Sequence, residues 1–105
     1  MRIEIKAMNK VNRPKPNKRG AIVIANFDCS VGPFDLKHCA LVRLFPGDLD
    51  RGLVIWTPRT EGPHGDWRGL YVTDRDLVFA IRDKARDVFE ALGGDVLAEV
   101  AVEVP

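Results

Sequence analysis

The sequence predicts an α+β fold: an antiparallel β-meander of four to five strands with one helix packed on it, followed by a short strand-like tail. Up to residue 72, short segments alternate polar and apolar residues between turns that contain Gly and Pro, which is typical of half-buried strands. One later segment spaces its apolar residues as an amphipathic helix does. We expect this helix to cover the sheet, so that the 105 residues form a single domain.

The first strand is expected at residues 2–8, where Ile3, Ile5 and Ala7 share one face. Residues 10–20 follow as an exposed, mobile basic loop, because neither a helix nor a central strand tolerates its two prolines. Short connections between the later strands make an antiparallel meander the simplest topology.

The next two strands are expected at residues 21–27 and 34–44, on either side of a turn at residues 31–33. The earlier one is a run rich in β-branched residues, which is typical of a buried strand. Strict alternation in the later one would place on one face Phe34, Leu36, His38, Ala40, Val42 and Leu44, and on the other Asp35, Lys37, Cys39, Leu41 and Arg43.

A break at residues 45–48 precedes another strand, expected at residues 53–57. Residues 58–66 contain two prolines and two glycines and predict a long loop. The last strand of the meander is expected at residues 67–72.

The helix is expected to have Thr73 as its N-cap, with Asp74 and Asp76 near the free N–H groups of the first turn. Gly93 and Gly94 follow as the C-terminal stop. At about 100° per residue, the predicted core-facing stripe consists of Leu77, Val78, Ile81, Ala85, Val88 and Leu92.

Composition and motifs favour a cytoplasmic, non-catalytic protein. The N-terminus lacks the apolar centre of a signal peptide, and the longest apolar run is far shorter than the ~20 residues of a membrane span. The chain shows no Ser/His/Asp motif, phosphate-binding Gly loop or Gly-x-Ser-x-Gly motif. We therefore expect no enzyme, no cofactor and no small-molecule substrate.

A metal site is not expected either. The residues that could bind a metal are Cys29, His38, Cys39 and His64, and their spacing matches no standard zinc pattern. Two cysteines do not form a disulfide framework, and buried reduced thiols are the better explanation for them.

Charge is unevenly distributed along the chain. Residues 1–20 carry seven Lys/Arg and one Glu, whereas residues 74–105 carry four Lys/Arg and eight Asp/Glu. A basic front of this kind can steer a polyanion to one end of a protein. A solvated loop is the alternative interpretation of residues 10–20.

Candidate nucleic-acid-binding residues fall into three groups. They are Lys15, Lys18 and Arg19 in the basic loop, Arg59 and Arg68 around the later loop, and Arg75 and Arg82 on the helix. The helix allows two interpretations. Its arginines and Phe79 could contact phosphates and bases, or they could form a solvated face with ion pairs such as Arg86–Glu90.

Residues 19–92 resemble the SpoVG (stage V sporulation protein G, septation regulator) family. That family has a Gly-Leu-apolar-apolar-x-x-Pro strand, then basic residues, a Gly-bearing turn and a C-terminal helix. The matching residues here are Gly52, Leu53, Val54, Ile55, Pro58, Arg59, Gly65, Trp67 and Arg68. The resemblance implies a regulator that binds DNA or RNA with little sequence preference and dimerises through its sheet.

We therefore expect a DNA- or RNA-binding regulator, with a protein-interaction module that uses a sheet edge as the alternative. The first strand and the alternating tail at residues 95–105 both offer an apolar edge without a central proline. A homodimer joined through a sheet edge is therefore predicted, with either the tail or the meander as its seam. No membrane partner is expected.

Overall fold

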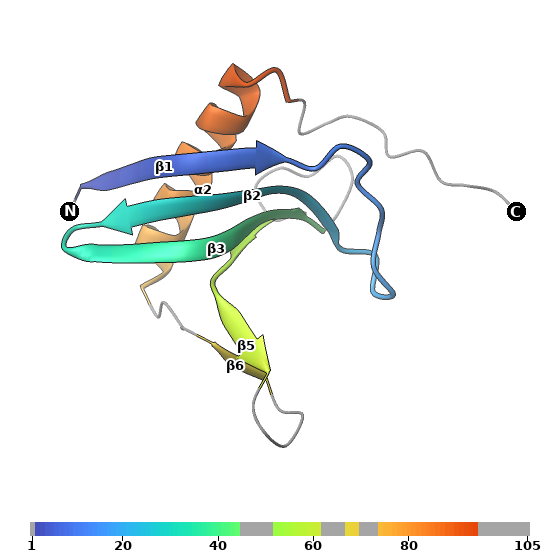
Figure 1. Cartoon of the computed structure of the whole chain (residues 1–105), viewed down its shortest axis with the longest axis horizontal. Coiled ribbons are helices and arrows are strands. Elements are labelled where there is room, and N and C mark those ends of the chain that lie inside the picture. The colour runs from blue at the N-terminus through green and yellow to red at the C-terminus, as the bar shows by residue number, and fades with distance from the viewer. Residues whose placement is uncertain (1, 45–51, 62–66, 70–73, 95–105) are drawn as a thin grey trace, which may run out of the picture.

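The computed structural model describes residues 2–44, 52–61, 67–69 and 74–94 (Figure 1). Its elements are β1 (Ile3–Lys10), β2 (Ile22–Val31), β3 (Phe34–Arg43), β4 (Leu53–Trp56), β5 (Arg59–Glu61), β6 (Trp67–Gly69) and α2 (Arg75–Ala91). Strands β1 to β4 form an antiparallel sheet in sequence order, whereas β5 and β6 form a separate two-stranded sheet.

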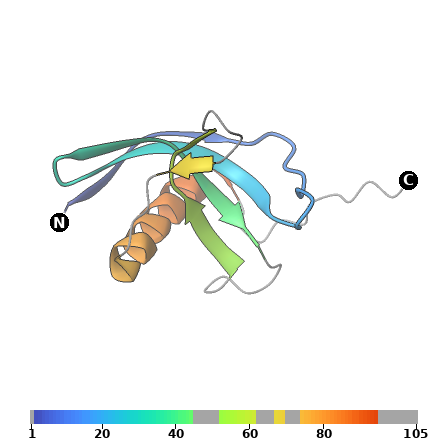
Figure 2. The same ribbon diagram turned by 90° about the horizontal axis from the view of Figure 1, so that it is seen from below.

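Helix α2 lies across one face of the four-stranded sheet, and the core fills the space between these two layers (Figure 2). This arrangement confirms the predicted α+β class. Fully or nearly fully buried members of the core include Phe27, Leu41 and Leu53 from the sheet and Ile81, Ala85 and Phe89 from the helix. In the described part of the chain, no helix is long and apolar enough to cross a membrane. The predicted tail at residues 95–105 lies outside the described residues.

Strand β1 contains a bulge that changes which side chains face the core. The pairing with β2 shifts register between Ile5 and Ala7, so that alternation does not continue through Lys6. As a result Met8 packs against the core, and Ala7 is exposed. The prediction that Ala7 shares the inner face of Ile5 is therefore wrong.

Strand β2 runs to Val31, well beyond the predicted end at residue 27. The sequence after Phe27 is more polar, but Cys29 and Val31 continue the buried face, and Asp28 and Ser30, which alternate with them, are only half-buried. The predicted turn follows. Gly32 has φ 56° and Pro33 has its φ fixed near about −65° by its ring. This sign pattern is that of a type II′ hairpin turn.

Strand β3 contains a bulge at His38. Lys37 and His38 together stand opposite the single residue Asp28, and His38 has φ 63°. Its backbone N–H donates to Asp28 Oδ1 at 3.0 Å, so that the donor released by the bulge is still satisfied.

The bulge moves β3 out of strict alternation. Leu36 and Cys39, on either side of the bulge, therefore both point into the core although they are three positions apart. The two predicted faces of this strand are wrong for that reason, because they assumed that alternation continues without interruption.

Strand β4 is confirmed, but the segment after it differs from the prediction. Residues 59–61 lie within the predicted loop and form β5, which pairs with β6 in antiparallel register. The β5–β6 hairpin projects away from the four-stranded sheet (Figure 1). The rest of the strand predicted at residues 67–72 lies beyond β6, outside the described residues.

The N-cap of α2 is Asp74, not Thr73 as predicted. Asp74 has an extended backbone, φ −81° and ψ 107°. Its carboxylate accepts hydrogen bonds from the N–H groups of Asp76 at 3.0 Å and Leu77 at 3.3 Å. An aspartate satisfies these free donors and also places negative charge at the positive end of the helix.

The predicted C-terminal stop of α2 is confirmed. Gly93 has φ 85°, and its N–H donates to Glu90 O at 2.9 Å. The N–H of Gly94 donates to Phe89 O at 2.9 Å. These two bonds form a Schellman motif, which requires a residue that tolerates positive φ at the position of Gly93.

The buried side of α2 differs from the predicted stripe, because the helix is rotated so that Phe89 and Arg82 face the sheet. Phe89 and Arg82 are buried, whereas Leu92 is 47% exposed and Val88 is only half-buried. The ring of Phe89 occupies the core at this end of the helix, directly beneath Gly94. Placing Leu92 in the core-facing stripe was therefore wrong.

Replacing Gly94 with Ala should destabilise the fold. A Cβ at this position would lie 2.5 Å from two ring atoms of Phe89, and overpacking a buried ring costs about 1–3 kcal/mol. Urea denaturation of the variant would measure the loss. The same substitution in a Phe89→Leu background should cost less, because the smaller side chain leaves room. Equal costs in both backgrounds would contradict the assignment to this contact.

Candidate nucleic-acid interface

The connection between β1 and β2, residues 11–21, carries a cluster of exposed positive charge that we call the basic arm. It contains the exposed cations Arg13, Lys15, Lys18 and Arg19. Between Glu4 and Asp28 the sequence has six Lys/Arg and no carboxylate, and all six basic residues are exposed. The structure therefore brings the three predicted candidates of this loop together on one solvent-facing segment.

The tip of the basic arm is a built turn. Gly20 N–H donates to Asn17 O at 3.0 Å, and Asn17 N–H donates to Ala21 O at 2.8 Å. The side-chain oxygen of Asn17 accepts two further bonds, from the N–H groups of Arg19 at 2.9 Å and Ala21 at 3.0 Å. Together with φ 82° at Gly20, this is a tight turn closed by a left-handed residue.

This turn fixes where the charges lie. Lys18 and Arg19 occupy its two central positions, so that two cations leave the backbone side by side at the exposed tip. Pro16 forms a β-bridge with Ile22 and anchors the base of the turn to the sheet. The tip thus has regular hydrogen bonding, and the predicted mobility of the loop stays a prediction.

Lys6 and Lys10 extend the positive region along β1. Lys6 is partly neutralised by Glu4, since Lys6 Nζ lies 3.1 Å from a Glu4 carboxylate oxygen. That hydrogen bond also lowers the pKa of Glu4. Lys10 Nζ lies beside Gly93, 3.7 Å from where a Cβ on that glycine would be. Lys10 therefore places positive charge beside the negative C-terminal end of α2. The most available cations are therefore those of the basic arm.

The second candidate group lies on the β5–β6 hairpin. Arg59 is the register partner of Gly69, and Arg68 is the register partner of Thr60. The backbones of Arg59 and Arg68 are therefore on adjacent strands, one register step apart. The pairing of β5 with β6 does not place these two arginines next to the basic arm.

The third candidate group, on α2, is divided by the structure. Arg75 is exposed in the first turn, between the carboxylates of Asp74 and Asp76. Arg82 is only 7% exposed, so the expectation that Arg82 lies on the outer face with Arg75 is wrong. The rotation of the helix toward Phe89 brings Arg82 against β4.

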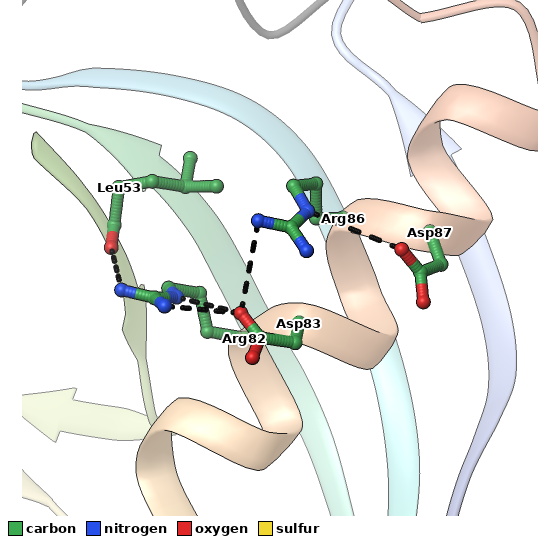
Figure 3. Close-up of polar contacts among 5 residues, drawn as sticks. All are labelled: Leu53, Arg82, Asp83, Arg86 and Asp87. Atoms are coloured by element: carbon green, nitrogen blue, oxygen red, sulfur yellow. Dashed lines mark hydrogen bonds and ion pairs between the residues drawn. The ribbon is translucent and has the colours of Figure 1, made fainter. Parts of the chain in front are cut away.

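Arg82 joins the helix to the sheet (Figure 3). Its Nη1 donates to Leu53 O on β4 at 3.5 Å, while its Nε and Nη2 both contact Asp83 Oδ1, at 3.1 and 3.0 Å. Its guanidinium carbon also lies 4.8 Å from the centre of the Phe79 ring, a cation–π contact. Arg82 is thus engaged in structural contacts on several sides.

The neighbouring charges on α2 neutralise one another. Arg86 Nη1 lies 3.9 Å from Asp83 Oδ1, and Arg86 Nε lies 3.9 Å from Asp87 Oδ1 (Figure 3). The predicted partner Glu90 is replaced by these two aspartates. This geometry favours the solvated-face interpretation of α2, because the carboxylates beside Arg86 would repel a phosphate.

Cys29 and Cys39 are both free thiols, buried on adjacent strands beside the His38 bulge. A hydrogen bond between them lowers the pKa of Cys29 and, together with burial, raises that of Cys39. Among the described residues, no group of three or more His, Cys, Asp or Glu side chains could hold a metal ion. His64 lies outside those residues.

Sequence reasoning missed Asn17. The predicted basic loop does not single it out, although it organises the turn that presents Lys18 and Arg19. The available signal was Asn17 followed three residues later by Gly20, a pairing suited to a turn that ends in positive φ.

Comparisons with protein-family models, with curated proteins and with solved structures returned no match to this chain.

Arg82→Met should destabilise the protein, whereas Arg86→Met should be nearly neutral. Methionine retains much of the buried apolar length of Arg82 but leaves Leu53 O without this donor, a loss of about 1–3 kcal/mol. The weaker pairs of Arg86 are worth under about 1 kcal/mol. Urea titrations followed by circular dichroism would measure both variants. Equal losses would contradict the structural role of Arg82.

Cys29 and Cys39 should resist a thiol reagent until the domain opens. Both thiols are buried, and access to the sulfur controls the reaction. We expect slow labelling in buffer and complete, rapid labelling of both in denaturant, read by mass spectrometry. Fast labelling of either thiol in the folded protein would show that this part of the sheet is open to solvent.

Proposed function

We propose that this protein is a cytoplasmic, non-catalytic regulator that binds nucleic acid, in the manner that the SpoVG resemblance implies. The observation that carries the proposal is the basic arm together with the strand before it. The four cations of the arm, with Lys6 and Lys10 of β1, make six exposed Lys/Arg between Glu4 and Asp28 with no carboxylate among them. Lysine and arginine clusters of this kind neutralise phosphates and release bound counterions.

Lys15, Lys18 and Arg19 are the proposed main phosphate contacts. Arg59 and Arg68 are proposed as additional contacts on the β5–β6 hairpin, as the resemblance implies, and Arg75 as a peripheral one. Arg82 supports the site only by holding α2 on β4, because its guanidinium is buried.

Binding should weaken steeply with salt, and the arm should account for much of that dependence. In filter-binding titrations between about 50 and 200 mM salt, the slope of log K against log salt should fall by about 0.9 for each phosphate contact removed. Lys18→Ala/Arg19→Ala should therefore show a shallower slope and a lower affinity. No binding to DNA or RNA at about 50 mM salt would refute the proposed function.

The matched control is Lys37→Ala/Lys84→Ala. Both lysines are exposed, Lys37 on β3 and Lys84 on α2, so this variant loses the same charge from other surfaces. It should retain nearly the wild-type affinity. An equal loss in both variants would mean that net charge, and not the arm, determines binding.

A homodimer joined through a sheet edge is part of the proposal. In the described sheet β1 and β4 are the outer strands, and β1 is eight residues long without a proline. Such an edge can pair with a second copy in an isologous contact. Light scattering should report twice the chain mass of 11.7 kDa, and a species of the single-chain mass would refute the dimer.

A protein-interaction module is the second candidate function, favoured by Phe34. This ring is 66% exposed at the β2–β3 turn, beside the exposed Pro33. Exposed aromatic residues are enriched at protein interfaces. Pull-down before and after nuclease treatment separates the two candidates, because partners held through nucleic acid are lost after digestion and direct protein partners are retained.

A further inference from the structure

We propose that the basic arm binds the phosphate backbone of a nucleic-acid double helix in preference to an unpaired strand, an inference that rests on the proposed function. The arm supplies exposed cations without a surface on which bases can stack. Proteins that bind single strands without sequence preference combine positive charge with aromatic side chains, whereas a duplex keeps its bases stacked and offers its phosphates.

The arm has no aromatic side chain of its own. Residues 1–26 contain no Phe, Tyr, Trp or His, and the first aromatic residue, Phe27, is 2% exposed and part of the core. An unpaired strand laid along the arm would therefore meet ammonium and guanidinium groups and no exposed ring from this segment.

In the four-stranded sheet and α2, the exposed aromatic residues lie elsewhere. Phe34 follows the far end of β2, whose ten residues separate it from the arm by about 30 Å at about 3.3 Å per residue. Phe79 lies on α2 with the guanidinium of Arg82 against its ring. Neither ring is placed to extend a binding surface from the arm.

The arm's cations are also available and preorganised. None of Arg13, Lys15, Lys18 and Arg19 pairs with a carboxylate of another described residue. The turn holds the backbone of Lys18 and Arg19 through Asn17. Binding therefore costs little backbone conformational entropy at these two residues. This suits a ligand whose phosphates are themselves held at regular positions, as they are along a duplex.

The ligand preference is tested by fluorescence anisotropy with three labelled probes of the same sequence: a DNA duplex of about 20 base pairs, two helical turns, the corresponding RNA duplex, and one DNA strand alone. At about 50 mM salt the duplexes should bind at least about five-fold more tightly than the single strand. If one duplex binds more tightly than the other, the result identifies DNA or RNA as the ligand. Either result supports the inference, provided that the duplex binds more tightly than the single strand.

The role of the turn is tested by two variants that leave the charge unchanged. Asn17→Ala removes the acceptor of two backbone hydrogen bonds. Gly20→Ala places a side chain on a residue with φ 82°, which strains the backbone, and no atom lies within 4 Å of the new Cβ, so that the variant causes no steric clash. Each should weaken duplex binding by about three- to ten-fold, because each destabilises the turn that holds Lys18 and Arg19. Circular dichroism confirms that each variant remains folded.

The outcomes separate this inference from the proposed function. Failure of all three probes to bind overturns the proposed function and the inference with it. Tighter or equal binding of the single strand leaves nucleic-acid binding in place and overturns the duplex preference. Unchanged duplex affinity in both Asn17→Ala and Gly20→Ala overturns the role of the ordered turn.

Discussion

The packing of α2 across the four-stranded sheet is the constraint on which the rest of this structure depends. Ile81, Ala85 and Phe89 are buried against strands that carry one apolar face each, and without the helix that face would be open to water. Both helix ends are closed by their own hydrogen bonds, at Asp74 and at Gly93, so the helix enters the core with few unsatisfied backbone groups. Its rotation about its own axis then decides which charged residues remain outside.

That rotation divides the arginines into two kinds. Arg82 lies between α2 and the sheet, where its side chain is buried and its guanidinium donates to a carbonyl of β4. Arg86, one turn further, stays at the margin among aspartates. The cations that we propose as phosphate contacts lie instead on the connection between β1 and β2, where none of Arg13, Lys15, Lys18 and Arg19 pairs with a carboxylate of another described residue.

The fold class could be predicted from the sequence because it follows from simple patterns, the β-branched run at residues 21–27 and the helical spacing of the stripe around Ile81. The errors have local physical causes. One extra residue between Ile5 and Ala7 in β1 and one at His38 in β3 reverse the faces of the residues that come later in the same strand, and a bulge leaves little trace in hydropathy. The arm's cations could be found from charge alone, whereas burial of Arg82 could not, since it depends on the orientation of the whole helix.

The connection between β1 and β2 is also asymmetric. The last hydrogen bond of the strands joins Val11 to Ile24, and the next bridge joins Pro16 to Ile22. Four residues on one side, 12–15, therefore stand opposite the single residue Val23 on the other. The sheet takes its register from β2, which is paired on both sides, so residues can be gained or lost within 12–15 without moving any core side chain. The number of cations on the arm can therefore change while the fold stays the same.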